Sequence, residues 1–378
     1  MKIFSLLGLV SLPIAALAET TLDPTLHMSV VGGISSADNP GDLALHAHDP
    51  NDDLALQGFD VGLNLRHDDW LAAFVNINAF TTPDGELDAE WEEAFAKLQN
   101  LPGGFELRAG RFQNRFGLEN HLHQHSWNFV NANLSTAQFL GEEALITEGL
   151  ELTWLRKSDY TLFALTGSLG KAAEHHGHGD EHGDEHGDEH GEHGSEEALF
   201  NEELATVRAL FSFHPNDFHH HRFGLNGAWG QNGYGNSRNT SLYSADYLYQ
   251  WRQNGLEADG REFSTGLEVF LRDVEWANDD GLSGESSQSG FMVFGRYRFA
   301  DQWIADLRYE ELQGREPAEE VTLGEDRERL SIALTREFEL SGWNSHARLQ
   351  YSHDQLEEGS EDTVWLQFGF DFGDGEVR

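Results

Sequence analysis

The stretch that decides the fold is the last strand-like segment, Thr363-Val-Trp-Leu-Gln-Phe-Gly-Phe-Asp-Phe372. In an extended chain, successive side chains point to opposite faces, so the residues of this segment divide into two sets. Val364, Leu366, Phe368, Phe370 and Phe372 share one face, and Thr363, Trp365, Gln367, Gly369 and Asp371 share the other. An apolar face backed by a more polar one is typical of a strand that separates lipid from a watery lumen.

The same alternation recurs along the chain in about ten-residue segments bounded by turn residues. Examples are the apolar sets at 223–229, 263–271, 303–309 and 330–334. A soluble β-sandwich would also alternate, so the connections decide between the two architectures. From Thr25 onward, short connections such as 300–301 and 341–342 alternate with long ones, which we place at 36–53, 81–87, 114–145, 170–200, 231–239, 276–288, 314–326 and 354–361.

Short turns at one rim and long loops at the other indicate an antiparallel up-and-down β-barrel. The sequence therefore predicts an all-β protein, a single transmembrane barrel of about 16 strands. This count requires residues 87–98 to form a strand, although their helix propensity also allows an amphipathic helix.

The N-terminus predicts the compartment. Lys2, an apolar run and the small-residue site Ala16-Leu17-Ala18 are typical of a cleaved signal peptide, residues 1–18, which leaves residues 19–378 as the barrel. No later segment has the ~18 consecutive apolar residues of a spanning helix. We therefore expect the outer membrane, with the long loops extracellular and both termini periplasmic. The expected partners are outer-membrane lipid and the barrel-assembly machinery, with no nucleic acid.

A barrel of about sixteen strands leaves an aqueous lumen, which predicts a pore. Arginine at the lipid-facing midplane would cost about 2–4 kcal/mol, so the arginines of the strands belong inside. We place six of them on the lumen wall, Arg222, Arg272, Arg296, Arg298, Arg308 and Arg348. They either form a basic wall that selects solutes or pair with Glu268, Asp306 and Glu310.

The long connection at 114–145 is rich in apolar and aromatic residues, which predicts that it folds into the lumen as a constriction. In an extended backbone His121, His123 and His125 would project to one side and, with Glu119, form a metal or proton-sensitive site. In a turn or helix they would diverge and serve packing instead. Glu142 and Glu143 are expected to face the arginines across the gap.

A second histidine group lies in the tract 171–197, which reads KAAEHHGHGDEHGDEHGDEHGEHGSEE. Its near-absence of apolar residues predicts a disordered external loop. Imidazoles among carboxylates suit Zn²⁺, Cu²⁺ and Ni²⁺, so we assign metal binding to its seven histidines, His175, His176, His178, His182, His186, His190 and His193. Composition shows a capacity to bind metal, and a merely soluble loop remains the alternative.

The stretch Glu92–Glu119, EEAFAKLQNLPGGFELRAGRFQNRFGLE, resembles the phosphate-selective porin O/P superfamily, whose pattern Gly110, Arg111, Phe112, Arg115, Phe116 and Gly117 match. The flanking HLHQHSWNFV resembles a narrower group with His-rich loops, often labelled zinc-regulated outer-membrane receptors. The resemblance implies a sixteen-stranded barrel. Phosphate selectivity does not carry over, because the chain has only four lysines and a formal net charge of -42.

These observations predict a non-enzymatic outer-membrane porin for passive diffusion of small ions or solutes, linked to divalent metal acquisition, with zinc as the favoured ion. No tightly bound cofactor is expected, and the resemblance to porins implies a homotrimer. Two alternatives remain: a metal-buffering or adhesion barrel without an open pore, and a general solute porin whose His-rich tract is incidental.

Overall fold

The computed structural model describes residues 20–36, 54–82, 85–141, 144–173, 198–234, 237–255, 260–278, 281–315, 317, 321, 323–324, 326–357 and 359–373. The predicted signal peptide, Glu142, Glu143 and all seven histidines of the His-rich tract lie outside these residues.

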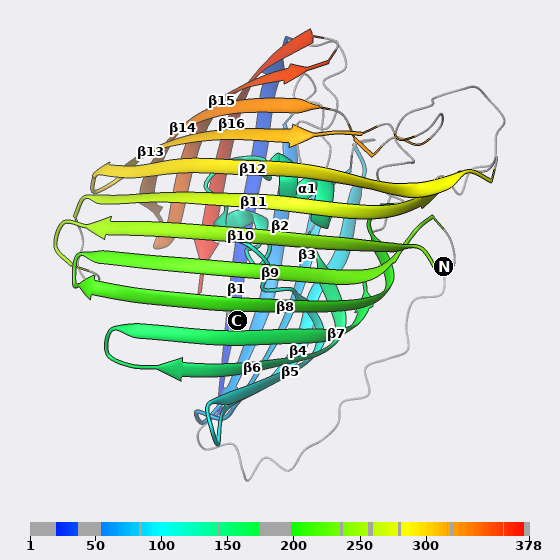
Figure 1. The fold of residues 1–378 in the computed structure, drawn as a ribbon. Coiled ribbons are helices and arrows are strands. Elements are labelled where there is room, and N and C mark those ends of the chain that lie inside the picture. The colour runs from blue at the N-terminus through cyan, green and yellow to red at the C-terminus, as the bar shows by residue number, and fades with distance from the viewer. Residues whose placement is uncertain are drawn as a thin grey trace, which may run out of the picture.

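Sixteen antiparallel strands close into one barrel in chain order, with β16 paired to β1 (Figure 1). The strands are β1 (Thr20–Ser35), β2 (Ala55–His67), β3 (Leu71–Thr81), β4 (Leu87–Leu101), β5 (Phe105–Gln113), β6 (Ile146–Lys157), β7 (Thr161–Ala172), β8 (Phe200–Asn216), β9 (His219–Asn232), β10 (Asn239–Arg252), β11 (Glu262–Ala277), β12 (Ser283–Ala300), β13 (Trp303–Gln313), β14 (Arg327–Leu340), β15 (Trp343–Leu356) and β16 (Gly359–Phe372). The predicted barrel and its strand count are confirmed, including the strand at β4.

The two faces of each strand differ as the alternation predicts. In β16 Leu366 is 42% exposed on the outer face, whereas Trp365 and Gln367 are buried on the inner face. In β13 Leu307 is exposed outside, while Arg308 and Glu310 are buried inside. The outer wall is therefore apolar and the inner wall polar, which is the inverse of a soluble barrel.

The connections differ from the expected lengths. The segment predicted as a long connection at 276–288 is strand up to Ala277 and again from Ser283. The one predicted at 354–361 is strand up to Leu356 and again from Gly359. The reason is that hairpins continue past the apolar band, where the strand ladder is hydrogen-bonded but both faces are polar. Residues 114–145 remain a long connection with the predicted bounds, between Gln113 and Ile146.

This connection, here called the constriction loop, folds into the lumen as predicted and carries a 3₁₀ turn, η2 (Gln124–Ser126), and a short helix, α1 (Leu134–Leu140), inside the ring of strands (Figure 1). The Asn133 side chain caps α1 by accepting from the Thr136 amide. The loop buries its apolar side chains in the barrel: Phe116 and Phe139 contact Phe270, and Leu118 and Phe129 pack with Met292 and Phe294. No helix among the described residues is long and apolar enough to cross a membrane.

Candidate functional site

The constriction loop is fixed by arginines of the wall. Arg308 on β13 donates to the Asn131 and Ala132 carbonyls at 3.2 and 3.3 Å. Arg272 on β11 donates to the Gln138 carbonyl at 2.9 Å, and Arg348 on β15 donates to the Trp127 carbonyl at 2.9 Å. Arg272 and Arg308 are fully buried, so the structure makes these two predicted pore-lining residues anchors of the loop rather than water-facing groups.

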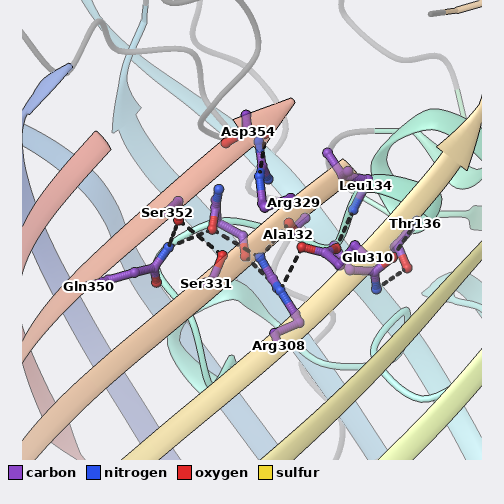
Figure 2. A network of polar contacts seen from close by, with 12 residues as sticks. Ala132, Leu134, Thr136, Arg308, Glu310, Arg329, Ser331, Gln350, Ser352 and Asp354 are labelled. Carbon is purple, nitrogen blue, oxygen red and sulfur yellow. Dashed lines mark hydrogen bonds and ion pairs between the residues drawn. The ribbon is translucent and has the colours of Figure 1, made fainter. Parts of the chain in front are cut away.

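Wall side chains also accept hydrogen bonds from amides of the loop. Glu310 accepts from the Leu134 amide at 2.7 Å, Glu268 accepts from the Leu118 amide at 3.0 Å, and the Gln350 amide oxygen accepts from the Val130 amide at 2.7 Å. Figure 2 shows Glu310 and Arg308 side by side on β13, pointing at the loop. The sequence placed both on the lumen face but did not reveal that their partner is the loop backbone.

The wall arginines form some of the expected ion pairs with Glu268, Asp306 and Glu310. Arg308 Nε lies 2.8 Å from a Glu310 oxygen, and Arg296 lies 3.3 Å from Asp306. Glu268 instead accepts from the loop and from Ser244. Sequence reasoning missed a further buried lumen pair, between Arg208 and Asp246 at 3.0 Å.

Two adjoining cavities remain between the constriction loop and the wall, of about 340 and 550 Å³. Both are lined by residues 126–128 of the loop and by Arg296. The first also reaches Arg222, Arg298, Glu119 and His121, so these predicted lumen residues do face open space. The linings include residues beside the short turns at 253–261 and 341–342, which places the cavities toward the short-turn rim.

The predicted site of His121, His123, His125 and Glu119 does not form. The backbone makes turns and a 3₁₀ turn here, so His121 separates from His123 and His125, whose ring centroids lie 5.7 Å apart. His121 lines the first cavity, and Glu119 accepts from Asn133 at 2.9 Å. His123 and His125 instead meet Asp60 of β2, with one donor atom from each within 4.8 Å of the others.

We call this group, together with Glu92 and Glu93 of β4, the Asp60 cluster. His125 Nδ1 lies 3.4 Å from Asp60 Oδ2, and His123 lies 3.5 Å from Glu92 and 3.1 Å from Glu93. Burial lowers the pKa of His125, although its hydrogen bond to Asp60 acts in the opposite direction. A buried imidazole held in its neutral form can offer a ring nitrogen to a cation.

The carboxylates of the Asp60 cluster lie on β2 and β4, whereas Arg222, Arg296, Arg298 and Arg348 lie on β9, β12 and β15. The expected acids, Glu142 and Glu143, fall outside the described residues. Charges of both signs occur on each side of the lumen, because Lys97 and Arg108 are buried on β4 and β5 and Asp306 on β13 pairs with Arg296.

Comparison with known proteins places the fold. No protein-family model matches the chain. An uncharacterized protein of Aquifex aeolicus is 41% identical over 75 residues, which cover 20% of this chain and 16% of that protein.

Solved structures match over nearly the whole chain. The outer membrane channel DcaP of Acinetobacter baumannii superposes with a TM-score of 0.57 at 10% identity, covering 93% of this chain and 97% of that one. The anion-selective porin from Comamonas acidovorans gives 0.54 at 11% identity, covering 94% and 100%. OmpT of Vibrio cholerae, in its trimer form, gives 0.56 at 9% identity, covering 93% and 99%. The chain therefore has the fold of the outer-membrane porins.

Proposed function

We propose that this chain is an outer-membrane porin through which small ions or solutes diffuse passively. The observation that carries the proposal is the pair of arginine-lined cavities beside a loop that is folded into the lumen and fixed there. The apolar outer face supports a position in lipid, and the porin fold of the neighbours supports a channel.

The charges of the lumen suggest how solutes are sorted. A solute between the loop tip and the wall meets Arg296, which lines both cavities and is only partly buried. Asp60 on β2 and Glu92 and Glu93 on β4 add carboxyl groups to the same lumen. Fixed charges along a narrow lumen orient dipolar solutes and set a preference among ions.

The test is single-channel recording of the refolded protein in a planar bilayer with a salt gradient. Stepwise currents and a nonzero reversal potential are expected. A silent membrane from correctly folded barrel would contradict the proposal and leave the second candidate, a metal-buffering or adhesion barrel.

We further propose a link to divalent metal, with zinc as the favoured ion. Its support is the net charge of -42 and the seven histidines of the His-rich tract, because an acidic surface concentrates cations. The test deletes residues 174–197, since Lys171 and Ala172 belong to β7. Conductance should persist while zinc-dependent uptake falls. Unchanged zinc-dependent uptake would favour a general solute porin in which the His-rich tract is incidental. The resemblance to zinc-regulated receptors would then not extend to function.

We also propose an orientation and partners for the barrel. Thr20 pairs with His67 beside a short turn and Leu26 pairs with Phe372, so β1 starts and β16 ends at the short-turn rim. We assign this rim to the periplasm and the long connections to the exterior, in contact with outer-membrane lipid after insertion by the assembly machinery. A homotrimer is supported by the trimer form of OmpT. We assign the chain no enzymatic activity.

A further inference from the structure

We propose that the Asp60 cluster binds one divalent transition-metal ion, of which Zn²⁺ is the test case, through Asp60, Glu92, His123 and His125. The ion would join the constriction loop to strands β2 and β4. This goes beyond the proposed channel, because binding at equilibrium requires no open pore and no His-rich tract.

The donor set has the composition and near-geometry of a zinc site. One donor atom each from Asp60, His123 and His125 lies within 4.8 Å of the others, and Glu92 lies 3.5 Å from His123 Nδ1. In a tetrahedral zinc site with bonds of about 2.1 Å, neighbouring donors are about 3.4 Å apart. The donors of Asp60, His123 and His125, now within 4.8 Å of one another, would therefore approach by up to about 1.4 Å on binding the ion.

Supporting groups stand where a metal site needs them. Histidine ligands commonly donate their second ring nitrogen to a carboxylate, which fixes the ring and raises its basicity. His123 contacts Glu92 through Nδ1 and Glu93 through Nε2, at 3.5 and 3.1 Å. His125 stacks on His27 with ring centroids 3.7 Å apart, and His27 is held by Asp371 at 2.7 Å.

Unsatisfied polar atoms at the same place point to a missing ligand. Asn76 is buried, and its amide nitrogen approaches Asp60, Glu92 and His123, yet its Oδ1 has no hydrogen-bond partner among the described residues. Gln124, only 8% exposed, has no partner for either amide atom within the described part of the chain. A buried polar group without a partner costs about 1–3 kcal/mol, which a bound cation and its waters would relieve.

Gly58 borders these groups. A Cβ there would lie 3.4 Å from Gln124 Oε1 and 3.7 Å from Asp60 Oδ2, which are van der Waals contacts. The second cavity reaches the cluster from the lumen, because His125 and Asp371 are among its lining residues. An ion can therefore arrive through water.

The donor atoms decide the class of ligand. Asp60 lies 3.4 Å from His125, and Glu92 and Glu93 lie 3.5 and 3.1 Å from His123. Carboxyl oxygens and imidazole nitrogens so close together suit a divalent transition-metal cation. Mixed imidazole and carboxylate donors favour Zn²⁺, Ni²⁺, Co²⁺ or Cu²⁺ over Ca²⁺ and Mg²⁺, which prefer oxygen donors alone.

The experiment isolates this site from the His-rich tract. In the full chain, the seven tract histidines are changed to asparagine, which preserves length, and the refolded protein is titrated with Zn²⁺ against a chromogenic chelator. One tight equivalent is expected. Asp60→Asn and, separately, His125→Gln in this background should weaken it by at least tenfold.

A matched control changes His353→Gln, since His353 pairs with Asp362 at 2.8 Å in an exposed position. It should leave the affinity unchanged. Circular dichroism checks that each variant retains the barrel, and X-ray absorption of the zinc-loaded background should show nitrogen and oxygen ligands at about 2.0–2.2 Å. The site would be overturned if the protein without the tract histidines bound no tight equivalent of Zn²⁺. It would also be overturned if Asp60→Asn and His125→Gln left the Zn²⁺ affinity of that protein unchanged. Either result would count against the site even if the protein conducts ions.

Discussion

Replacing Arg308 with methionine should release the constriction loop from the wall. Arg308 donates to the Asn131 side chain at 3.1 Å as well as to two carbonyls of the loop, pairs with Glu310 at 2.8 Å, and lies 4.3 Å from the centre of the Phe129 ring. Methionine retains an apolar stem of similar length and keeps part of the packing on Phe129, but it removes every donor.

The magnitude follows from burial. Arg308 and Glu310 are both fully buried, and removing one partner of a buried pair costs about 3–5 kcal/mol because the other charge is left uncompensated. At about 1.4 kcal/mol per tenfold change, the detached state of the loop should become about a hundred- to several-thousand-fold more populated. The strands themselves should keep their pairing.

Hydrogen exchange measured by mass spectrometry reports the population of the detached loop. Peptides from the constriction loop should exchange faster in Arg308→Met, while those from β14 and β15 should not. Single-channel conductance should also rise, since the loop no longer narrows the lumen. Arg336→Met is the matched control: Arg336 is exposed on the outer face and stacks on Trp303 at 5.5 Å.

The double variant Arg308→Met, Glu310→Gln should release the loop less than Arg308→Met alone, because it leaves no uncompensated charge of this buried pair. The assignment of Arg308 as an anchor would be refuted if the loop exchanged equally fast in Arg308→Met and Arg336→Met and the conductance did not change.

Other variants test the loop, the outer face and the lumen. Gly117→Ala should loosen the loop, because Gly117 has φ of 63° and a Cβ there would lie 2.0 Å from Glu268 Oε1. Gly295→Ala is the control, since a Cβ at Gly295 meets open space. Equal hydrogen exchange of the loop amides in the two variants would count against this close approach. Leu366→Arg should lower the free energy of unfolding in lipid vesicles by about 2–4 kcal/mol relative to Leu366→Ala, and an equal stability would show that this face does not meet lipid. Arg296→Gln should shift the reversal potential toward cations by removing a positive charge from both cavities, and an unchanged potential would place the ion path elsewhere.

Alternation predicted the barrel because the lipid-facing residues of each strand must be apolar. The bounds of the constriction loop also followed from composition, since residues such as Phe116 and Phe139 require burial and an external loop has no other dry surface. Beyond the apolar band this signal ends. The start of β12, Ser283-Gly-Glu-Ser-Ser, is polar on both faces, so the sequence there does not predict a strand.

The sequence does not predict the Asp60 cluster, for a different reason. Glu92 and Glu93 are neighbours, and in a regular strand only one of them would face the lumen. The pairing of β3 with β4 shifts between Asn76 and Ile77, so that Asn76 lies opposite Glu93 and Ile77 opposite Trp91. This bulge turns both carboxylates toward the lumen, and its position depends on packing that a single sequence does not display.

The anchoring of the constriction loop has a consequence for the order in which the protein is made. The loop is synthesised before its anchors on β11, β13 and β15: the Leu118 amide bonds a residue 150 positions later, the Leu134 amide one 176 later and the Val130 amide one 220 later. Contacts so distant in sequence form slowly, because long chain segments must be ordered first. Until β15 is in place, the loop can contact only earlier strands, as Gln57 does at the Val130 carbonyl. Docking of the loop is therefore a late event, and protection of its amides during refolding would mark the moment at which the wall is complete.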